Sequence, residues 1–374
     1  MRYLAALLLC AVARGQNVFH VGSGGSYAQI HQALAVAVAG DVIVVAPGIY
    51  EAFTMTAGVT LRQAQTNEPS VISSSPVVID VPAGQQAYVF GLRFYTSTVV
   101  RRGQVGFERC SFEGFPTTLA IDAAAEVVMV QSQVIGGVSA AAGARVRGRL
   151  AATFCSFAGG PWWVTAGGPG LVVEGGGLHA TRCTFTGGDV SFGSAAAHDA
   201  LVVQAGNAWL ADCTITGGSS PAGPGGAGIR NLTSQPVATA RTTAQAGAGV
   251  PAGAAVVGPS AAEPLLGVLG PVNGIRRGAQ YGFLVYGVPG TPVFMLFSTA
   301  ARGAAHPALA QPAWLGAGAD LWTMVPVDPL GSALFVSTVP NVPALLDARV
   351  FFHPLGIDAN SRVQVAPPSG CLVQ

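Results

Sequence analysis

The chain of 374 residues exceeds the usual size of one domain, so it holds either two domains or one elongated repeat body. Half of its residues are apolar and only 9% are charged. All 18 basic residues are arginine, and the formal net charge is +1. This balance excludes a basic footprint for nucleic acid and a polybasic membrane patch.

The first 15 residues have the pattern of an export signal. Arg2 is followed by an apolar run over 4–12 and by small residues suited to cleavage near Ala13. The run is too short to span a bilayer, and no later stretch is long enough for a transmembrane helix. We therefore expect residues 1–15 to be removed and the mature chain to be secreted, or held in the periplasm or at the cell surface.

A short phrase recurs along the middle of the chain. It opens with Cys or Ser, alternates apolar and hydroxyl residues, and ends at glycine. The copies begin at Cys110, Ser132, Cys155, Cys183 and Cys213, which lie 22, 23, 28 and 30 residues apart. Residues 171–188 align without a gap on 201–218, with nine of 18 positions identical. The chain therefore contains an internal repeat.

The spacing of this repeat predicts stacked strands. Alternation with a period of two sends apolar groups to one face of a strand. A unit of roughly 20–30 residues without helical periodicity is typical of one β-helix coil, which cannot bury its inward face without neighbours. We expect one interior ladder of Phe112, Val134, Phe157, Phe185 and Ile215, and another of the opening residues. Cys183 and Cys213 are either bridged or stacked as buried thiols, and we favour thiols because in-register side chains point the same way.

The start of the mature chain predicts a cap for this stack. Residues 26–39 place Ile30, Ala33, Leu34, Ala37 and Val38 on one helical stripe, with Ser26 as the N-cap and Gly40 as the stop. A buried strand, a Pro-Gly turn and a second strand follow. An amphipathic helix at this point would cover the open apolar end of the first coil.

Three phrases in this stretch carry a family resemblance: Tyr27–Ile30, Gly40–Ile43 and Pro47–Tyr50. In this order they resemble the N-terminus of the pectin-lyase-like β-helix superfamily. The resemblance implies an all-β fold, a right-handed parallel β-helix over 16–230 with an N-terminal capping helix. It implies little about function, because members include lyases, hydrolases, esterases and non-enzymes.

Composition changes after the repeat. Residues 231–262 are rich in Ala, Gly, Pro, Ser and Thr, and we expect a linker there. Residues 263–374 contain strand-like segments separated by turns, which predict a small C-terminal β-sandwich. The segments are 281–286, 292–297, 334–336 and 348–352. This part looks like the modules that end many secreted bacterial repeat proteins.

Candidates for chemistry lie in the two longest coils, because loops on rigid scaffolds carry most sites. The catalytic candidates are Glu174, His179, Arg182, Asp189, His198 and Asp199. Stacking should bring Arg182 beside Asp212 as a surface ion pair of little energetic weight. No two carboxylates of the repeat are adjacent, so we expect no metal site and no cofactor.

Two features suit a ligand. Trp162 and Trp163 either stack on sugar rings or fill a widened coil, and we favour packing. Arg145, Arg147 and Arg149 lie on one side of an expected strand, where they either grip an acidic polymer or form a solvated face, which we favour. Asn231 begins a glycosylation sequon, a pattern common by chance.

Two functional hypotheses follow. The first is a non-catalytic exported β-helix, structural or adhesive at the cell surface, with polysaccharide or other cell-envelope components as partners along its long side. The second is a carbohydrate-active enzyme, a lyase or glycoside hydrolase acting on an acidic polysaccharide. Three carboxylates converging in one cleft beside Arg145 or Arg182, or two carboxylates with an arginine and a histidine, would favour the enzyme, and scattered carboxylates would favour the binding protein.

Overall fold

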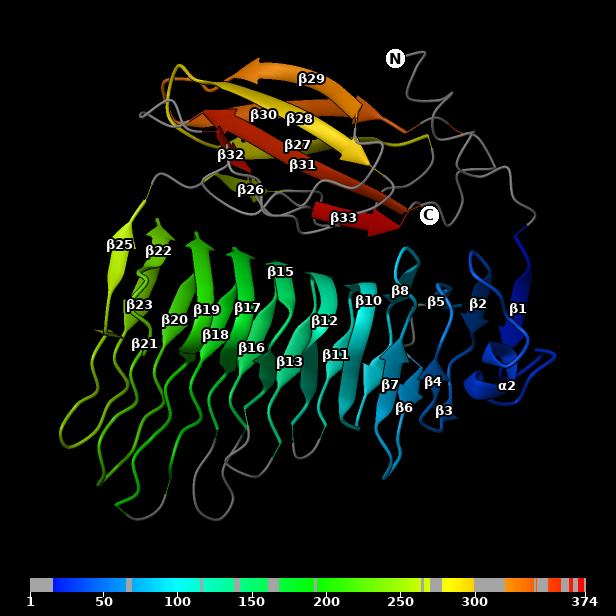
Figure 1. The fold of residues 1–374 in the computed structure, drawn as a ribbon, viewed down its shortest axis with the longest axis horizontal. Coiled ribbons are helices and arrows are strands. Elements are labelled where there is room, and N and C mark those ends of the chain that lie inside the picture. Colours follow the sequence, from blue (N-terminus) through cyan, green and yellow to red (C-terminus); the bar gives the residue numbers. More distant parts are fainter. Residues whose placement is uncertain are drawn as a thin grey trace. The chain divides into compact units, whose positions relative to one another are not determined.

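The computed structural model describes residues 16–64, 69–114, 117–137, 142–160, 168–191, 194–263, 266–269, 278–298, 320–339, 341, 349–357, 363–365 and 369–372. Val18–Glu263 form one compact unit, and the chain from Pro264 onward belongs to a second. Strands dominate both units (Figure 1), which makes the protein all-β as predicted.

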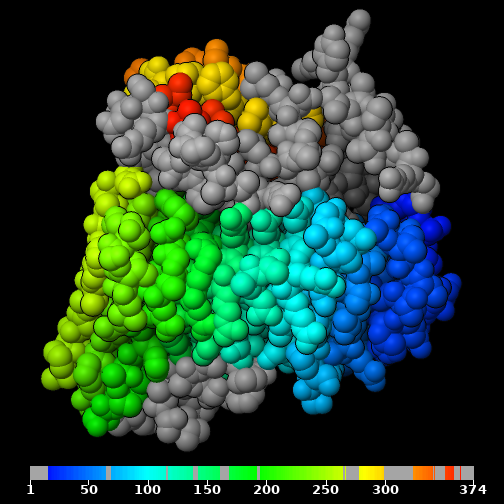
Figure 2. Space-filling model, viewed as in Figure 1, coloured from blue at the N-terminus to red at the C-terminus, as the bar shows by residue number. Residues whose placement is uncertain are grey.

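The first unit is a parallel β-helix built from two long parallel sheets. Consecutive strands of each sheet come from consecutive coils, and the colours change in order along the stack (Figure 2). The first sheet runs β1 (Val18–Val21), β2 (Val42–Val45), β5 (Thr60–Gln63), β8 (Gln86–Phe90), β10 (Thr98–Glu108), β12 (Leu119–Val130), β14 (Ala144–Val146), β17 (Leu171–Thr181), β19 (Leu201–Ala211), β21 (Ile229–Asn231) and β24 (Val256–Val257), with β4 (Thr54–Met55), β7 (Val77–Asp80), β15 (Arg149–Thr153), β22 (Val237–Ala240) and β25 (Ser260–Ala262) paired beside this path. The second sheet runs β3 (Ile49–Tyr50), β6 (Ser70–Val71), β9 (Arg93–Phe94), β11 (Ser111–Phe112), β13 (Gln133–Ile135), β16 (Ser156–Ala158), β18 (Thr184–Thr186), β20 (Thr214–Thr216) and β23 (Thr243–Gln245).

The interior ladder predicted from the repeat phrase is confirmed. Its members occupy equivalent positions on neighbouring strands of the second sheet, and none is exposed to solvent: Phe112, Val134, Phe157, Phe185 and Ile215. The Phe157 and Phe185 rings stack with centroids 5.2 Å apart and planes 10° apart. Stacking of the coils thus creates the core.

The opening residues of the phrases form the second ladder. Cys110, Cys155, Cys183 and Cys213 are buried free thiols, so the Cys183–Cys213 bridge is not formed. Each sulfur lies 3.3–3.5 Å from the carbonyl oxygen two residues earlier. The Ser132 hydroxyl donates to the equivalent carbonyl, that of Val130, at 2.9 Å. Burial, reinforced by the neighbouring thiols, raises the pKa of Cys183 well above its ordinary value, which suits thiols acting as small apolar residues.

The residue before each ladder position turns the chain sharply. Its φ lies between 45° and 55° at Arg109, Gln131, Phe154, Arg182, Asp212 and Arg241. This left-handed conformation costs a non-glycine residue about 1–2 kcal/mol. The buried ladder residue that follows holds the turn in place, and the turning residues form an external row.

The Gly-Gly turns after the phrases bring neighbouring backbones into contact. A Cβ added at Gly218 would lie 2.2 Å from the carbonyl oxygen of Gly188, and one added at Gly187 would lie 2.5 Å from the backbone nitrogen of Gly218. Any side chain here would push adjacent coils apart, which explains why glycine recurs at these turns.

The capping helix is shorter than expected. α2 covers only Ile30–Leu34, and its N-cap is Gln29 rather than Ser26. The helix begins late because the Gln32 side chain accepts hydrogen bonds from the backbone N–H groups of Ala28 and Gln29, both at 3.0 Å. α2 contacts β1, β2 and β4, and Ile30 and Ala33 join the core at the N-terminal end of the stack (Figure 1).

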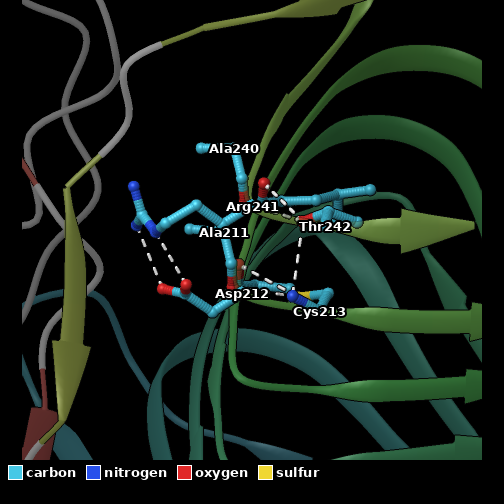
Figure 3. Close-up of polar contacts among 8 residues, drawn as sticks. Ala211, Asp212, Cys213, Ala240, Arg241 and Thr242 are labelled. Carbon is cyan, nitrogen blue, oxygen red and sulfur yellow. Dashed lines mark hydrogen bonds and ion pairs between the residues drawn. The ribbon is translucent and has the colours of Figure 1, made fainter.

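The expectation of a linker over residues 231–262 is wrong, because this range continues the β-helix. β22 pairs with β19 and β25, and β23 pairs with β20, all in parallel. Thr242 takes the place of the ladder cysteine: its Oγ1 accepts from the N–H of Cys213 at 3.3 Å and donates to the carbonyl of Ala240 at 3.0 Å (Figure 3). A hydroxyl therefore substitutes for the thiol in the last complete coil.

The second unit contains antiparallel sheets that share one hydrophobic core. One sheet runs β26 (Gly267–Leu269), β27 (Gln280–Tyr286) and β30 (Ser332–Thr338), and the other runs β29 (Asp320–Pro326), β28 (Pro292–Ser298), β31 (Arg349–Ile357) and β32 (Val363–Val365), with β33 (Ser369–Leu372) beside β31. Phe283 of the first sheet and Phe352 of the second meet with ring centroids 4.3 Å apart. The four predicted strand segments fall on β27, β28, β30 and β31. Within the described chain, no helix has the length and apolar character needed to cross a bilayer.

Candidate ligand-binding face

The long strands of the first sheet bend midway, and polar side chains gather on the outer side of the bend. Gln104, Glu126, Arg149, Gly177 and Asn207 occupy equivalent positions on neighbouring strands. We call this set the polar row. Adjacent strands lie about 4.8 Å apart, so the row presents one position per coil at a regular spacing.

Local sequence places one arginine in this row and two more beside it. Arg145 belongs to β14, Arg149 begins β15, and Arg147 lies in the bend between them. Val146 is fully buried, which sends its neighbours outward. The bend needs Gly148, because a Cβ there would lie 2.3 Å from the carbonyl oxygen of Ala125.

Each arginine contacts a carboxylate on an adjacent coil. Arg145 Nη1 lies 3.0 Å from Glu174 Oε1, and Arg147 Nε lies 2.8 Å from Glu174 Oε2. Arg149 Nη1 lies 3.3 Å from Glu126 Oε1. The acids largely offset the arginines, so these residues offer little attraction for an acidic polymer.

Charges alternate in sign from coil to coil along the bend. Arg102 pairs with Asp80, and Arg147 pairs with Asp122 at 3.8 Å in addition to Glu174. Like charges at equivalent positions of adjacent strands would repel, and the alternation avoids this. The arginine of each pair is partly exposed, so each pair contributes only about 0–1 kcal/mol to stability.

Trp209 flanks the polar row on β19, opposite His179 of β17. The two rings meet edge to face with centroids 4.6 Å apart. A Cβ at Gly177 would lie 3.4 Å from Trp209 Cζ3, so the indole reaches over Gly177. Trp209 is partly exposed, whereas His179 is buried, and burial lowers the pKa of His179 to about 3. His179 is therefore neutral and packs against the edge of the indole.

The acidic candidates in the long loops accept hydrogen bonds from backbone N–H groups. Asp189 accepts from the N–H of Ser219 at 2.7 Å. Asp199 accepts from the N–H of Ala227 at 2.6 Å and forms an ion pair with Arg230. Burial lowers the pKa of His198, partly offset by Asp199. These contacts tie each loop to the next coil.

Arg182 lies in the external row of turning residues. Its backbone N–H donates to the carbonyl of Ala211 at 2.9 Å, next to Asp212. The Asp212 carboxylate receives two hydrogen bonds from Arg241 of the following coil, at 2.7 and 3.0 Å (Figure 3). Asp212 is thus paired with Arg241 of a later rung, one that the Cys phrase did not reveal.

The structure therefore does not gather the six catalytic candidates. Glu174 follows the half-strand Leu171–Val173, whereas His198 and Asp199 precede the neighbouring half-strand Leu201–Val203, at its other end. Trp162 and Trp163 lie outside the described residues. Asn231 is 3% exposed and donates to the carbonyls of Gln235 and Pro259, so its amide is not available for a glycan.

Sequence reasoning missed Asp122, Glu126, Asn207 and Trp209 as members of the outer face. The signal for the last two was present, because the gap-free alignment of 171–188 on 201–218 sets Asn207 opposite Gly177 and Trp209 opposite His179. In the part of the chain that the structure describes, no three His, Cys, Asp or Glu side chains are arranged to hold a metal ion.

Comparisons with known proteins give limited information. No family model matches the chain, and no curated protein matches it. Among solved structures, the enzymatically active domain of tailspike protein 2 from bacteriophage CBA120 shares 7% identity at a TM-score of 0.34, over 96% of this chain and 76% of that one. The full-length tailspike protein 2 from an Escherichia coli O157:H7 bacteriophage shares 9% identity at a TM-score of 0.29, over 95% of this chain and 68% of that one. At this identity no side-chain role carries over between the proteins.

Proposed function

We propose that this chain is an exported, non-catalytic β-helix protein that binds an extended, neutral polysaccharide along the polar row. The observation that carries the proposal is the repetition of the row: Gln104, Glu126 and Arg149 hold one position on three successive coils. Asn207 holds it two coils later, after Gly177, with the partly exposed Trp209 beside it. A polysaccharide also repeats at a short, regular interval. Aromatic faces stack on sugar rings, and amide and charged groups bind sugar hydroxyls.

The charge pattern favours a neutral ligand. Arg145, Arg147 and Arg149 are each offset by Glu126 or Glu174, so the patch has no surplus of positive charge. Binding of a neutral glycan depends little on salt, whereas binding of a uronate would weaken as ionic strength rises.

The second candidate is a carbohydrate-active enzyme, a lyase or hydrolase acting on an acidic polysaccharide. Asp122, Glu126 and Glu174 do gather beside the arginines, as that hypothesis requires. Against it, each of these carboxylates is held by an arginine at 2.8–3.8 Å, whereas a glycoside hydrolase needs a carboxyl group that is free to donate a proton to the leaving group. These acids serve the ion pairs rather than proton transfer.

The proposal also covers the location of the protein and the role of its second unit. The export pattern of residues 1–15 supports secretion or display at the cell surface, and the N-terminal phrases support kinship with pectin-lyase-like β-helices. The paired antiparallel sheets of the second unit support a C-terminal sandwich module that terminates the β-helix.

Replacing Trp209 with alanine should weaken glycan binding about tenfold, the equivalent of about 1.4 kcal/mol, because the stacking surface is lost. Retention of the full mature chain on a glycan array identifies the ligand, and titration calorimetry gives the affinity of each variant. Arg241→Gln alters the external row away from the polar row and should bind like the unaltered protein.

The same samples separate the two functions. Retention without released product supports binding, and unsaturated or reducing-end product would establish the enzyme instead. If Trp209→Ala and Arg241→Gln bind equally well, the polar row is not the binding face.

A further inference from the structure

The second unit ends one of its sheets with an open strand. β30 pairs with β27 over Gln280–Tyr286 without a register shift, and it is the outer strand of that sheet in the described residues. Backbone hydrogen bonds at both ends of β30 show which of its residues bond to the β27 side. Gly287 donates to the carbonyl of Gly331, and Val339 donates to that of Ala279. Because antiparallel partners alternate, the N–H and C=O groups of Leu334 and Val336 point away from β27.

The side chains of this edge are uncharged, and the two exposed ones at its centre are apolar. Ala333 and Phe335 point into the core, whereas Leu334 is 58% and Val336 is 48% exposed. β30 contains no Asp, Glu, Arg or Pro. Exposed strand edges are usually protected by charge, proline or a bulge, since unpaired backbone groups template strand addition.

The edge strand of the other sheet has this protection. β29 ends at Pro326, and its pairing with β28 shifts register between Met295 and Leu296. The absence of such devices from β30 distinguishes it as a surface suited to pairing.

We propose that β30 is a self-association edge that pairs antiparallel with β30 of a second copy of this chain. The pattern is self-complementary about Phe335. A twofold axis there sets Leu334 opposite the partner's Val336, and Val336 opposite the partner's Leu334. Both pairs are of the hydrogen-bonded kind, in which the two residues exchange both of their backbone bonds.

Symmetry and chemistry favour a second copy over a foreign strand. An isologous contact uses the same patch on both subunits, and it joins the exposed Leu334 and Val336 side chains on one face as cross-strand pairs. A strand of seven residues buries less than a standard interface of about 1,600 Å². We therefore expect a reversible dimer with a Kd on the order of micromolar.

Sedimentation velocity of the full mature chain over a wide concentration range tests this edge. The unaltered protein should shift reversibly from monomer to dimer. Leu334→Lys and Val336→Lys place like charges near the twofold axis and should weaken the dimer at least tenfold. Val336→Pro removes one outward N–H without touching a bond to β27, and it should have the same effect.

Met324→Lys is the matched control, because Met324 is 54% exposed on β29, outside the pairing. It should leave the dimer unchanged, and circular dichroism should show that every variant is folded. A protein that remains monomeric at the highest concentration would overturn the proposal. So would a dimer that survives Leu334→Lys and Val336→Pro, or one that Met324→Lys weakens equally. Glycan retention is measured separately, so failure here leaves the proposed binding function untouched.

Discussion

Replacing Phe157 with alanine should lower the free energy of unfolding of the β-helix unit by about 3–5 kcal/mol. The Phe157 side chain has no exposure to solvent and stacks on Phe185 with centroids 5.2 Å apart. It lies between Val134 and Phe185 in the ladder, so its removal opens a cavity with packed groups on both sides. Few single substitutions exceed this cost, because the rigid coils cannot collapse into the gap.

Urea unfolding followed by far-ultraviolet circular dichroism measures the effect, with the slope checked for constancy. Thr184→Ala is the control, because Thr184 lies next to Phe185 on the same strand and is exposed. It should change stability by less than about 0.5 kcal/mol. Equal effects of Phe157→Ala and Thr184→Ala would mean that the ladder does not carry the core.

The ladder could be predicted from sequence because the coils are stacked in register. Residues that align between two repeats therefore also pair between two neighbouring strands. The gap-free match of 171–188 on 201–218 reproduces the observed pairing from Gly177↔Asn207 onward. It fails by one residue at Glu174, which pairs with Ala205, because the strands bulge at the bend. Periodicity cannot reveal a bulge, since the extra residue is absorbed by local geometry.

The last coils were hidden for a different reason. Thr242 makes the hydrogen bonds of a ladder residue, and Arg241 adopts the left-handed turn that precedes each rung. The composition nevertheless changes there, because Ala244 fills the ladder position held by Phe, Val or Ile in earlier coils. The coil geometry continues after the recognisable repeat phrase has ended. A small inward side chain such as Ala244 gives no hydrophobic signal in the sequence.

The candidate face was only partly predictable. Outward arginines follow from the buried Val146, but their partners are set by the stacking of coils of unequal length. Glu174 lies 29 residues after Arg145, and Glu126 lies 23 residues before Arg149. Such separations follow no local rule, so the sequence suggested a basic grip where the structure has offset charges.

Acidification should destabilise the second unit through His353. This ring is fully buried on β31, its Nε2 lies 3.1 Å from Ser298 Oγ, and its Nδ1 has no hydrogen-bond partner in the described structure. Burial lowers the pKa of His353 from 6.5 to about 3. A charged imidazolium carries N–H groups on both nitrogens, so protonation would leave a buried donor unsatisfied.

The sign follows from proton linkage. Between pH 6.5 and about 3 the unfolded chain binds a proton at this histidine and the folded chain does not, so stability falls as pH falls. The slope approaches about 1.4 kcal/mol per pH unit, which amounts to about 2 kcal/mol lost at pH 5 relative to neutral pH. Above pH 6.5 this contribution is constant.

Urea titrations at a series of pH values measure the slope, and His353→Gln should remove it while retaining a side chain able to hydrogen-bond Ser298. His179 makes the matched comparison, because burial lowers its pKa to about 3 in the other unit. Replacing His179 with glutamine should remove the pH dependence of the unfolding free energy in the β-helix unit only. If His353→Gln leaves the pH dependence of the second unit unchanged, the ring is protonated in the folded protein and the buried site must be more polar than its packing against Ser298 implies.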